Sequence, residues 1–202
     1  MKLTTSRLLL LSVTLLLTAI TKAQGVPAEP KVTVAKGTVI VYNVKENKNT
    51  YQYTVTITKF SEADGVEFKW TTNEKPARSG TTSMPFNNIN EGKNLMVKPV
   101  TGKEKLGEDQ VRLFFTDDLL VTLIGNKTVD FSIDGKQNTF MYLATKAETT
   151  DYDYNGKKIT VDYTSADAGD VYVGFVTVGD GNIMHSFRSK EMQFTLQSIT
   201  TK

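Results

Sequence analysis

Alternating acids followed by an Asn-Gly pair form the sharpest chemical motif of the chain. The residues are Asp151, Asp153, Asn155 and Gly156. Oxygen ligands at alternate positions, with a glycine for the tight turn, reproduce the first half of a calcium-binding loop. Asp162 takes the twelfth position, where an EF-hand loop has a bidentate glutamate. The three acids and Asn155 are therefore candidate metal ligands, and calcium is the one cofactor that the sequence suggests.

A plain β-hairpin explains the same segment. Tyrosines alternate with the acids as in a strand, whereas an EF-hand would need helices on both sides. Asn155-Gly156 is typical of a two-residue type I′ turn. That turn would place Asp153 opposite Lys158 as a cross-strand ion pair. It would also place Tyr152 opposite Ile159 as an apolar pair. The hairpin is the favoured interpretation, and a calcium site would need further ligands from elsewhere.

The single histidine, His185, is the other residue with catalytic chemistry. It precedes Ser186, and a serine next to a histidine would suit a nucleophile with its general base. Side chains of successive strand residues point to opposite faces, however, so we expect the two not to meet. A structural or surface role is therefore favoured for His185.

Carboxylate pairs for glycosidase-type hydrolysis are available, as in any chain with 22 acidic residues. The pairs are Asp117 with Asp118, Asp167 with Asp170, and Asp151 with Asp162. The sequence has no phosphate-binding glycine loop, no nucleophile elbow and no metalloprotease helix motif. No catalytic residue is therefore assigned, and an enzyme is the minority interpretation.

Aromatic residues on predicted strands favour binding. The candidate ligand-binding residues are Tyr53, Trp70, Tyr152 and Tyr154. Aromatic rings on sheets form stacking platforms for sugars and walls for lipids. Core packing is the alternative, and we favour it for Trp70, which lies on the apolar face of its strand. Tyr152 and Tyr154 lie near a hairpin tip, where we expect exposure.

Period-two alternation of apolar and polar residues predicts strands along most of the chain. The clearest are residues 38–44, 51–60, 66–70, 129–133, 139–143 and 157–163. Asp64-Gly65 and Asp134-Gly135 lie between such segments and predict hairpins. Residues 171–178 are apolar on both faces, with Gly174 at the centre, which is typical of a strand covered on both sides or bending around a core.

The remaining segments are weaker. Thr116 before Asp117 and Asp118 predicts a short helix over 117–124 that stops at Gly125. Residues 75–110 are either a functional excursion or a set of short elements. The predicted fold is mainly β: one antiparallel curved sheet of about nine or ten strands, closed as a barrel or half barrel or folded as a β-sandwich, with one or two short helices.

Residues 1–23 have the parts of a secretory signal peptide: a charged start, an apolar run and small residues before Gln24. The apolar run is too short to cross a bilayer. We expect cleavage between Ala23 and Gln24, a flexible lead-in over 24–34, and a single β-rich domain over 35–202. The product would be soluble in the periplasm or outside the cell, with no transmembrane segment.

Composition excludes some functions. Lys2, Arg7 and Lys22 leave with the leader, so 21 of the 24 basic residues remain against 22 acidic ones. Such a balance disfavours a nucleic-acid partner, which requires a clustered basic face. The chain has no cysteine, so burial alone must stabilise it, and its length is sufficient for one core.

Residues 37–44, 51–58, 65–70 and 79–84 together resemble a family of uncharacterised secreted or periplasmic β-rich proteins of Gram-negative bacteria. The resemblance covers the first two thirds of the mature chain and brings no catalytic residues. By fold analogy, such domains resemble the half barrels of periplasmic lipoprotein carriers, whose concave face holds acyl chains. The analogy implies a lipid-binding face on the inward sides of the strands that carry Val39, Tyr53, Phe68 and Phe175.

The favoured function is a non-enzymatic binding domain of the cell envelope. Its partner would be a lipid or other small apolar or amphipathic ligand, or an envelope protein. The first alternative is a carbohydrate-binding or calcium-supported adhesion module that uses Tyr152, Tyr154 and the hairpin from Asp151 to Asp162. The second is a carboxylate-dependent hydrolase.

Overall fold

Strands dominate the computed structural model, which describes residues 32–143, 148–178 and 181–201. These residues all belong to one unit, Lys31–Lys202. The predicted signal peptide and most of the predicted lead-in lie outside the described residues. In the first half of the chain the strands are β1 (Val39–Glu46), β2 (Asn49–Ser61), β3 (Gly65–Thr72), β4 (Ser79–Met84), β5 (Asn94–Leu95), β6 (Gly102–Lys105), β7 (Gln110–Val111) and β8 (Phe114–Phe115).

The remaining elements are two helices and seven strands. The helices are α1 (Asn88–Glu91) and α2 (Asp117–Asn126). The strands are β9 (Thr128–Ile133), β10 (Lys136–Tyr142), β11 (Glu148–Tyr154), β12 (Lys157–Asp167), β13 (Tyr172–Val178), β14 (Gly181–Arg188) and β15 (Met192–Thr200). The prediction of a mainly β barrel with short helices is confirmed.

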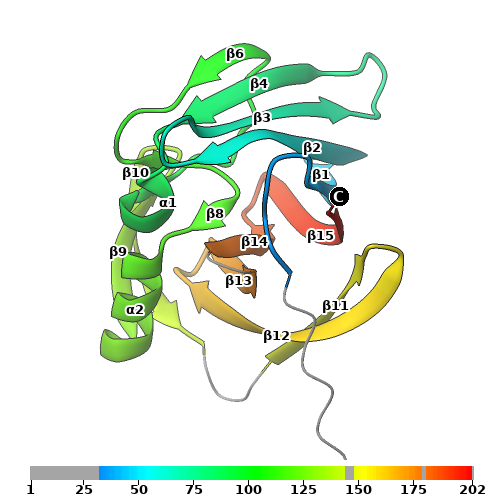
Figure 1. Ribbon diagram of the computed structural model, residues 1–202. Helices are drawn as coiled ribbons and strands as arrows, with labels where there is room; N and C mark the ends of the chain where they lie inside the picture. The colour runs from blue at the N-terminus through cyan, green and yellow to red at the C-terminus, as the bar shows by residue number, and fades with distance from the viewer. Residues whose placement is uncertain (1–31, 144–147, 179–180, 202) are drawn as a thin grey trace, which may run out of the picture. The chain divides into compact units, whose positions relative to one another are not determined.

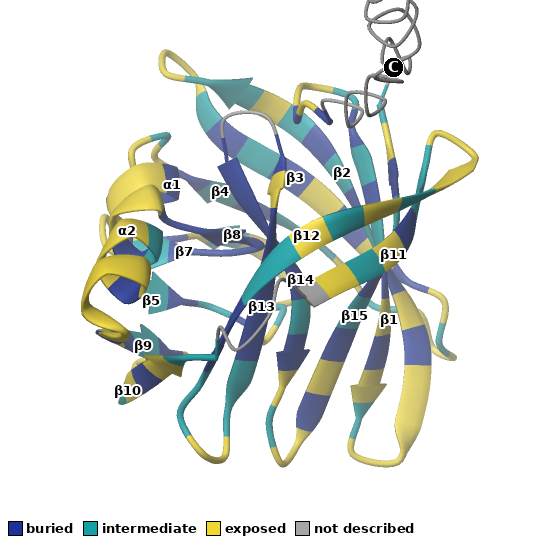
Figure 2. Cartoon of the chain, turned by 90° about the horizontal axis from the view of Figure 1, so that it is seen from below, coloured by how far each residue is buried: buried dark blue, intermediate teal, exposed yellow. Residues whose placement is uncertain are grey.

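The strands join one sheet, and all but β8 and β11 follow the order β6-β4-β3-β2-β1-β15-β14-β13-β12-β10-β9-β5-β7. β8 pairs antiparallel with β14. β11 closes part of this sheet, because it pairs antiparallel with β12 and parallel with β15. The closed ring of five strands therefore comprises β11 to β15. The β11–β12 hairpin crosses in front of β13, β14 and β15 in Figure 2.

Aromatic side chains fill the space under β1 to β4, which form the upper layer in Figure 1. The Tyr53 and Trp70 ring centroids are 5.5 Å apart, and Tyr53 packs edge-on against Phe194 at 6.0 Å. A second aromatic cluster stacks Phe115 on Phe175 at 3.8 Å and contacts β9 through Phe131. Burial of such large side chains on alternate strand positions stabilises the sheet without disulfides.

The predicted hairpins are confirmed in position. Asp134 and Gly135 both have positive φ, at 48° and 81°, between β9 and β10. The β11–β12 turn at Asn155 and Gly156 has φ values of 52° and 79°. Its register pairs Asp153 with Lys158 and Tyr152 with Ile159, as predicted. Positive φ at both central residues is the type I′ geometry that matches strand twist.

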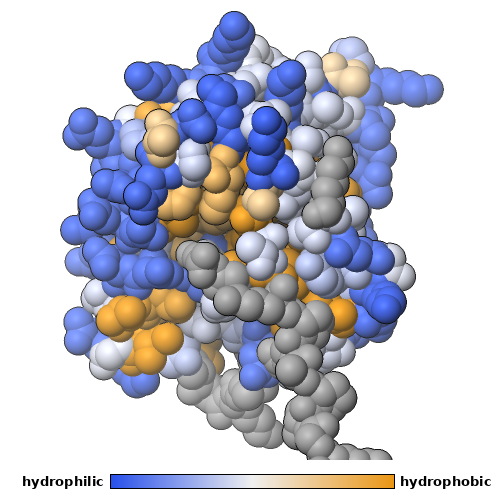
Figure 3. Space-filling view, in the orientation of Figure 1, coloured by the Kyte–Doolittle hydropathy of each residue, from blue (hydrophilic) through white to orange (hydrophobic). Residues whose placement is uncertain are grey.

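The predicted helix forms, with a different end. Thr116 caps α2, since its side chain accepts a hydrogen bond from the Leu119 amide. The helix continues past Gly125 to Asn126, and Lys127 adopts the left-handed conformation at φ 63°. α2 leaves Val121 and Ile124 exposed, in the apolar region that Figure 3 shows over this helix. Within the described ranges, no helix has the length and apolar character to cross a membrane.

Residues 75–110 contain short elements around a buried arginine. The Arg112 guanidinium pairs with the Glu104 carboxylate and donates to the Thr82 hydroxyl. It also donates to the carbonyl oxygens of Met96, at 3.0 Å, and Lys98, at 2.7 Å. All its donors are thereby used, which offsets the cost of burying the charge. The strand count was predicted too low because two-residue strands carry no periodicity.

Candidate functional site

The predicted ligand-binding aromatics are mostly inaccessible. Tyr53 is 2% exposed and Trp70 is 1% exposed, so the expectation of core packing for Trp70 is confirmed. The expectation of exposure is wrong for Tyr152, which is 4% exposed because β11 curves back to pair with β15. Tyr154 is half-buried, and its hydroxyl lies 3.2 Å from the Thr201 hydroxyl. These four side chains do not share a surface for a ligand.

The candidate metal ligands contact protein groups. Asp151 forms an ion pair with Lys158 at 2.7 Å and accepts a hydrogen bond from the Thr160 hydroxyl at 2.6 Å. These contacts lower the pKa of the Asp151 carboxyl below its ordinary value. The predicted partner of Lys158 was Asp153, which lies opposite it, but the lysine instead pairs diagonally with Asp151 on the neighbouring strand. Asp153 instead accepts from the Gly156 amide at 2.8 Å.

The remaining members of the motif also serve the hairpin. The Asn155 side chain exchanges hydrogen bonds with Thr201 beyond β15. Asp162 is exposed and lies opposite Thr149. Among the described residues, no group of three or more histidine, aspartate or glutamate side chains is placed to hold a metal ion.

His185 and Ser186 meet, contrary to prediction. The register of β14 against β13 shifts between Gly174 and Phe175, which leaves His185 as an extra residue in a β-bulge. The bulge brings His185 Nδ1 to 3.2 Å from Ser186 Oγ, while Nε2 lies 2.7 Å from the Thr150 hydroxyl. Burial lowers the pKa of the His185 imidazole below its ordinary value.

The Ser186 hydroxyl is tightly packed. A Cβ placed on Gly174 would lie 2.6 Å from Ser186 Oγ, and the Tyr163 ring centroid is 5.2 Å from that of His185. The His185–Ser186 pair therefore contributes a hydrogen-bonded polar cluster that joins β11 to β14.

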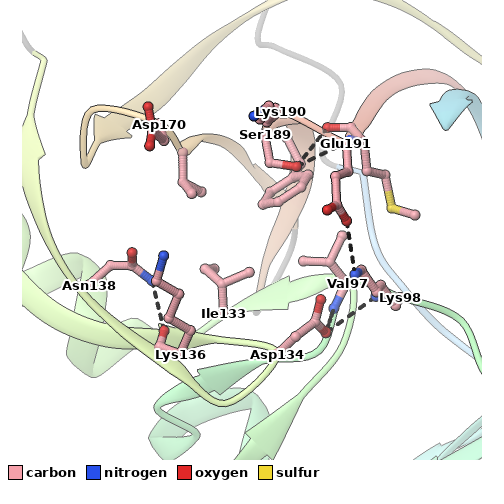
Figure 4. Close-up of a pocket in the computed structure, with 13 residues that line it drawn as sticks. Val97, Lys98, Ile133, Asp134, Lys136, Asn138, Asp170, Ser189, Lys190 and Glu191 are labelled. Carbon is pink, nitrogen blue, oxygen red and sulfur yellow. Dashed lines mark hydrogen bonds and ion pairs between the residues drawn. The ribbon is translucent and has the colours of Figure 1, made fainter. Parts of the chain in front are cut away.

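A groove of about 370 Å³ lies where four connections meet (Figure 4). The connections are the β9–β10 turn, the segment after β5, the β12–β13 turn and the β14–β15 turn. The lining residues are Val97, Lys98, Ile133, Asp134, Lys136, Asn138, Asp170, Val171, Phe187, Ser189, Lys190, Glu191 and Met192. The apolar members are buried or half-buried, whereas the charged members are exposed around them.

The floor of the groove is apolar. Val97, Ile133, Phe187 and Met192 are buried, and Val171 is half-buried in the wall. A concave apolar surface with a few polar groups at its margin is the usual form of a small-molecule site.

Two of the acids at the rim are already engaged. Asp134 Oδ1 accepts hydrogen bonds from the amides of Val97, at 2.8 Å, and Lys98, at 3.3 Å. The Lys98 ammonium forms an ion pair with Glu191 at 3.2 Å (Figure 4). The positive-φ turn at Asp134 thus holds the segment after β5 against β9. The Lys98–Glu191 pair joins two exposed side chains across the rim, so the amide contacts of Asp134 are the ones that hold this side of the groove.

A tight turn presents the opposite rim. The Ser189 amide donates to the Met192 carbonyl at 2.8 Å, and the Ser189 hydroxyl accepts from the Met192 amide at 3.2 Å. Lys190 and Glu191 are consequently exposed at its tip, while Met192 returns to the floor. Of the lining residues, the sequence singled out Asp170 as a member of a carboxylate pair, and the Asp134-Gly135 turn signal also falls in this region.

A second depression, of about 530 Å³, lies beside the β2–β3 turn. Charged residues such as Lys59, Glu62 and Asp64 line it, and Met84 is the one buried residue in its lining. It lacks the apolar floor of the first groove, so the first groove is the stronger candidate.

Comparisons with protein-family models, curated proteins and solved structures found no significant match.

Proposed function

We propose that the protein is a non-enzymatic binding domain for a small amphipathic ligand, held in the groove beside Val97 and Val171. The apolar floor under a charged rim is the observation that carries the proposal. The groove volume of about 370 Å³ falls in the range of ligand pockets, roughly 300–1,000 Å³. Burial of the apolar part of a ligand would supply the affinity, and the rim would select its polar end.

The acids of the groove support binding rather than carboxylate-dependent hydrolysis. A glycosidase needs two carboxyl groups that flank the scissile bond. Asp134 holds backbone amides and Glu191 pairs with Lys98, so Asp170 is the acid at the rim without such a contact among the described residues. The His185–Ser186 pair does not line the groove. An envelope location for this binding rests on the predicted leader.

The test is a fluorescence titration of the mature protein with anilinonaphthalene sulfonate, an amphipathic probe. Val171→Trp places a large ring in the wall of the groove and is expected to weaken binding by about tenfold or more. Val121→Trp is the matched control, because Val121 is 71% exposed on α2 and does not line the groove. Equal binding by the two variants would overturn the proposal.

A further inference from the structure

We infer that the polar end of the ligand is an anion, and that Lys136 and Lys190 bind it. This inference rests on the proposed function, because it assigns the chemistry of the same groove. The two lysines belong to different elements, Lys136 to the start of β10 and Lys190 to the β14–β15 turn. Both are exposed and both line the groove. Figure 4 places Lys136 beside Ile133 at the lower left and Lys190 beside Ser189 at the top.

The rim carries equal numbers of positive and negative side chains, but these side chains differ in the protein contacts that they make. Three lysines and three acids line the groove. The Lys98–Glu191 ion pair cancels one charge of each sign. The Asp134 carboxylate is partly neutralised by the two amides that donate to it.

Two ammonium groups and one carboxylate of the rim have neither an ion pair nor a side-chain hydrogen bond among the described residues. These are Lys136, Lys190 and Asp170. Asp134 also lacks an ion pair within this part of the chain, but two backbone amides donate to its Oδ1. An anion at the rim therefore meets two ammonium groups without a partner. Against them stand the Asp170 carboxylate, also without a partner, and the Asp134 carboxylate, whose charge two amides partly offset. The engaged groups set the shape of the groove, and the free groups set its preference for charge.

The depth of the site fits a ligand with an apolar body and a charged end. Its apolar part would displace water from the floor at Val97, Ile133 and Met192. Its anionic end would stay at the wet rim, so no charge needs to be buried. Lysine side chains suit this position because their stems pack on apolar surface while the ammonium groups stay in water.

Calorimetric titration with three probes tests the inference. Octanoate, 1-octanol and octyltrimethylammonium share one apolar chain and differ in the charge at its end. We expect octanoate to bind about tenfold more tightly than octyltrimethylammonium, with 1-octanol between them. Rising ionic strength should reduce this difference, because exposed charges are screened.

A double substitution locates the effect. Lys136→Gln with Lys190→Gln should abolish the preference for octanoate and leave 1-octanol binding unchanged. Lys103→Gln with Lys105→Gln, on exposed β6 outside the groove, removes the same net charge and should preserve the preference. Loss of the preference in both variants would show a general charge effect and would overturn the assignment to Lys136 and Lys190.

The outcomes separate the two proposals. Equal binding of all three probes, or tighter binding of octyltrimethylammonium, would overturn the inference and leave the proposed function standing. Failure of all three probes to bind would overturn the proposed function, and the inference with it.

Discussion

Two regions of the same sheet differ in what fills the space behind the strands. Under β1 to β4, large aromatic side chains such as Tyr53, Trp70 and Phe194 occupy it and contact one another. At the groove, shorter side chains such as Val97 and Ile133 line the floor and leave a hollow. Both regions alternate apolar and polar residues, so alternation reports which face is buried and not whether the buried space is filled.

The filled region also explains why the aromatic candidates failed to mark a site. Tyr53 and Trp70 pack against neighbouring rings, Tyr152 is buried, and the Tyr154 hydroxyl lies beside that of Thr201. The groove forms where strands end, and its polar groups come from three turns, the segment after β5 and the start of β10. Binding surface in this fold is therefore expected at the strand ends rather than on the inward faces of β1 to β4.

The largest expected contrast concerns stability. Trp70→Ala removes a fully buried side chain and should lower the free energy of unfolding by about 3–5 kcal/mol. Val171→Ala, in the half-buried wall of the groove, should cost less than about 1 kcal/mol. Denaturant unfolding of both variants measures the contrast. Similar losses would mean that the two regions do not differ in packing.

Arg112 links the two regions, because its guanidinium holds the carbonyl groups on either side of Val97. Arg112→Met leaves Glu104 without its partner and should cost about 3 kcal/mol. It should also weaken probe binding, since the floor of the groove loses its anchor. A second variant, Arg112→Met with Glu104→Gln, should recover part of the stability and none of the binding. Unchanged binding in the single variant would separate the groove from this ion pair.

Alanine substitutions at two glycines are expected to change stability in opposite directions. A Cβ on Gly80 would lie 2.7 Å from the Trp70 ring, so Gly80→Ala should destabilise by about 1–3 kcal/mol. Gly125 lies in α2 with nothing within 4 Å of such a Cβ, so Gly125→Ala should stabilise by about 0.5–1 kcal/mol. Thermal unfolding of the two variants is the check. A stabilising Gly80→Ala would show that the aromatic layer is loosely packed.

A further predicted effect depends on pH. The folded-state pKa of His185 is lowered, so above about pH 6.5 the imidazole is neutral in both states and contributes no pH dependence. As pH falls below that value, the unfolded chain binds the proton more readily, and stability decreases until the folded pKa is reached. The loss at about pH 5.5 should be at most about 1.4 kcal/mol.

His185→Gln is the matched control for this effect. Glutamine keeps polar contacts toward Thr150 and Ser186 and does not titrate. Unfolding free energies measured at about pH 7.5 and about pH 5.5 should differ less for the variant than for the native chain. An identical pH dependence would place the titration elsewhere. Because His185 is the one histidine of the chain, this interval isolates it from the carboxylates.

Local patterns predicted much of the fold. Gly135 and Gly156 marked their turns because type I′ geometry needs positive φ, and Thr116 marked the start of α2 because it caps the amide of Leu119. The β14 bulge at His185 was missed, since a bulge breaks the alternation on which the opposite-face argument depends. The end of α2 was misplaced because Lys127, not a glycine, adopts the left-handed conformation.

The candidate groove was not predictable from local patterns. Val97 and Met192 are 95 residues apart in the chain and meet through sheet pairing alone. Which lysines of the groove lack an ion pair likewise depends on long-range contacts. Lys98 pairs with Glu191 from a distant segment, which leaves Lys136 and Lys190 without a partner among the described residues. The closure of β11 against β15, which buries Tyr152, also depends on a pairing with no local signal.

Amide NMR spectra of the isotope-labelled mature protein, recorded during a titration with octanoate, would locate the ligand in the fold. We expect chemical-shift changes concentrated at Val97, Ile133, Val171 and Met192, with little change along β2 and β3. Changes centred on Tyr53 and Trp70, or no saturable change at any residue, would contradict the proposed binding in the groove.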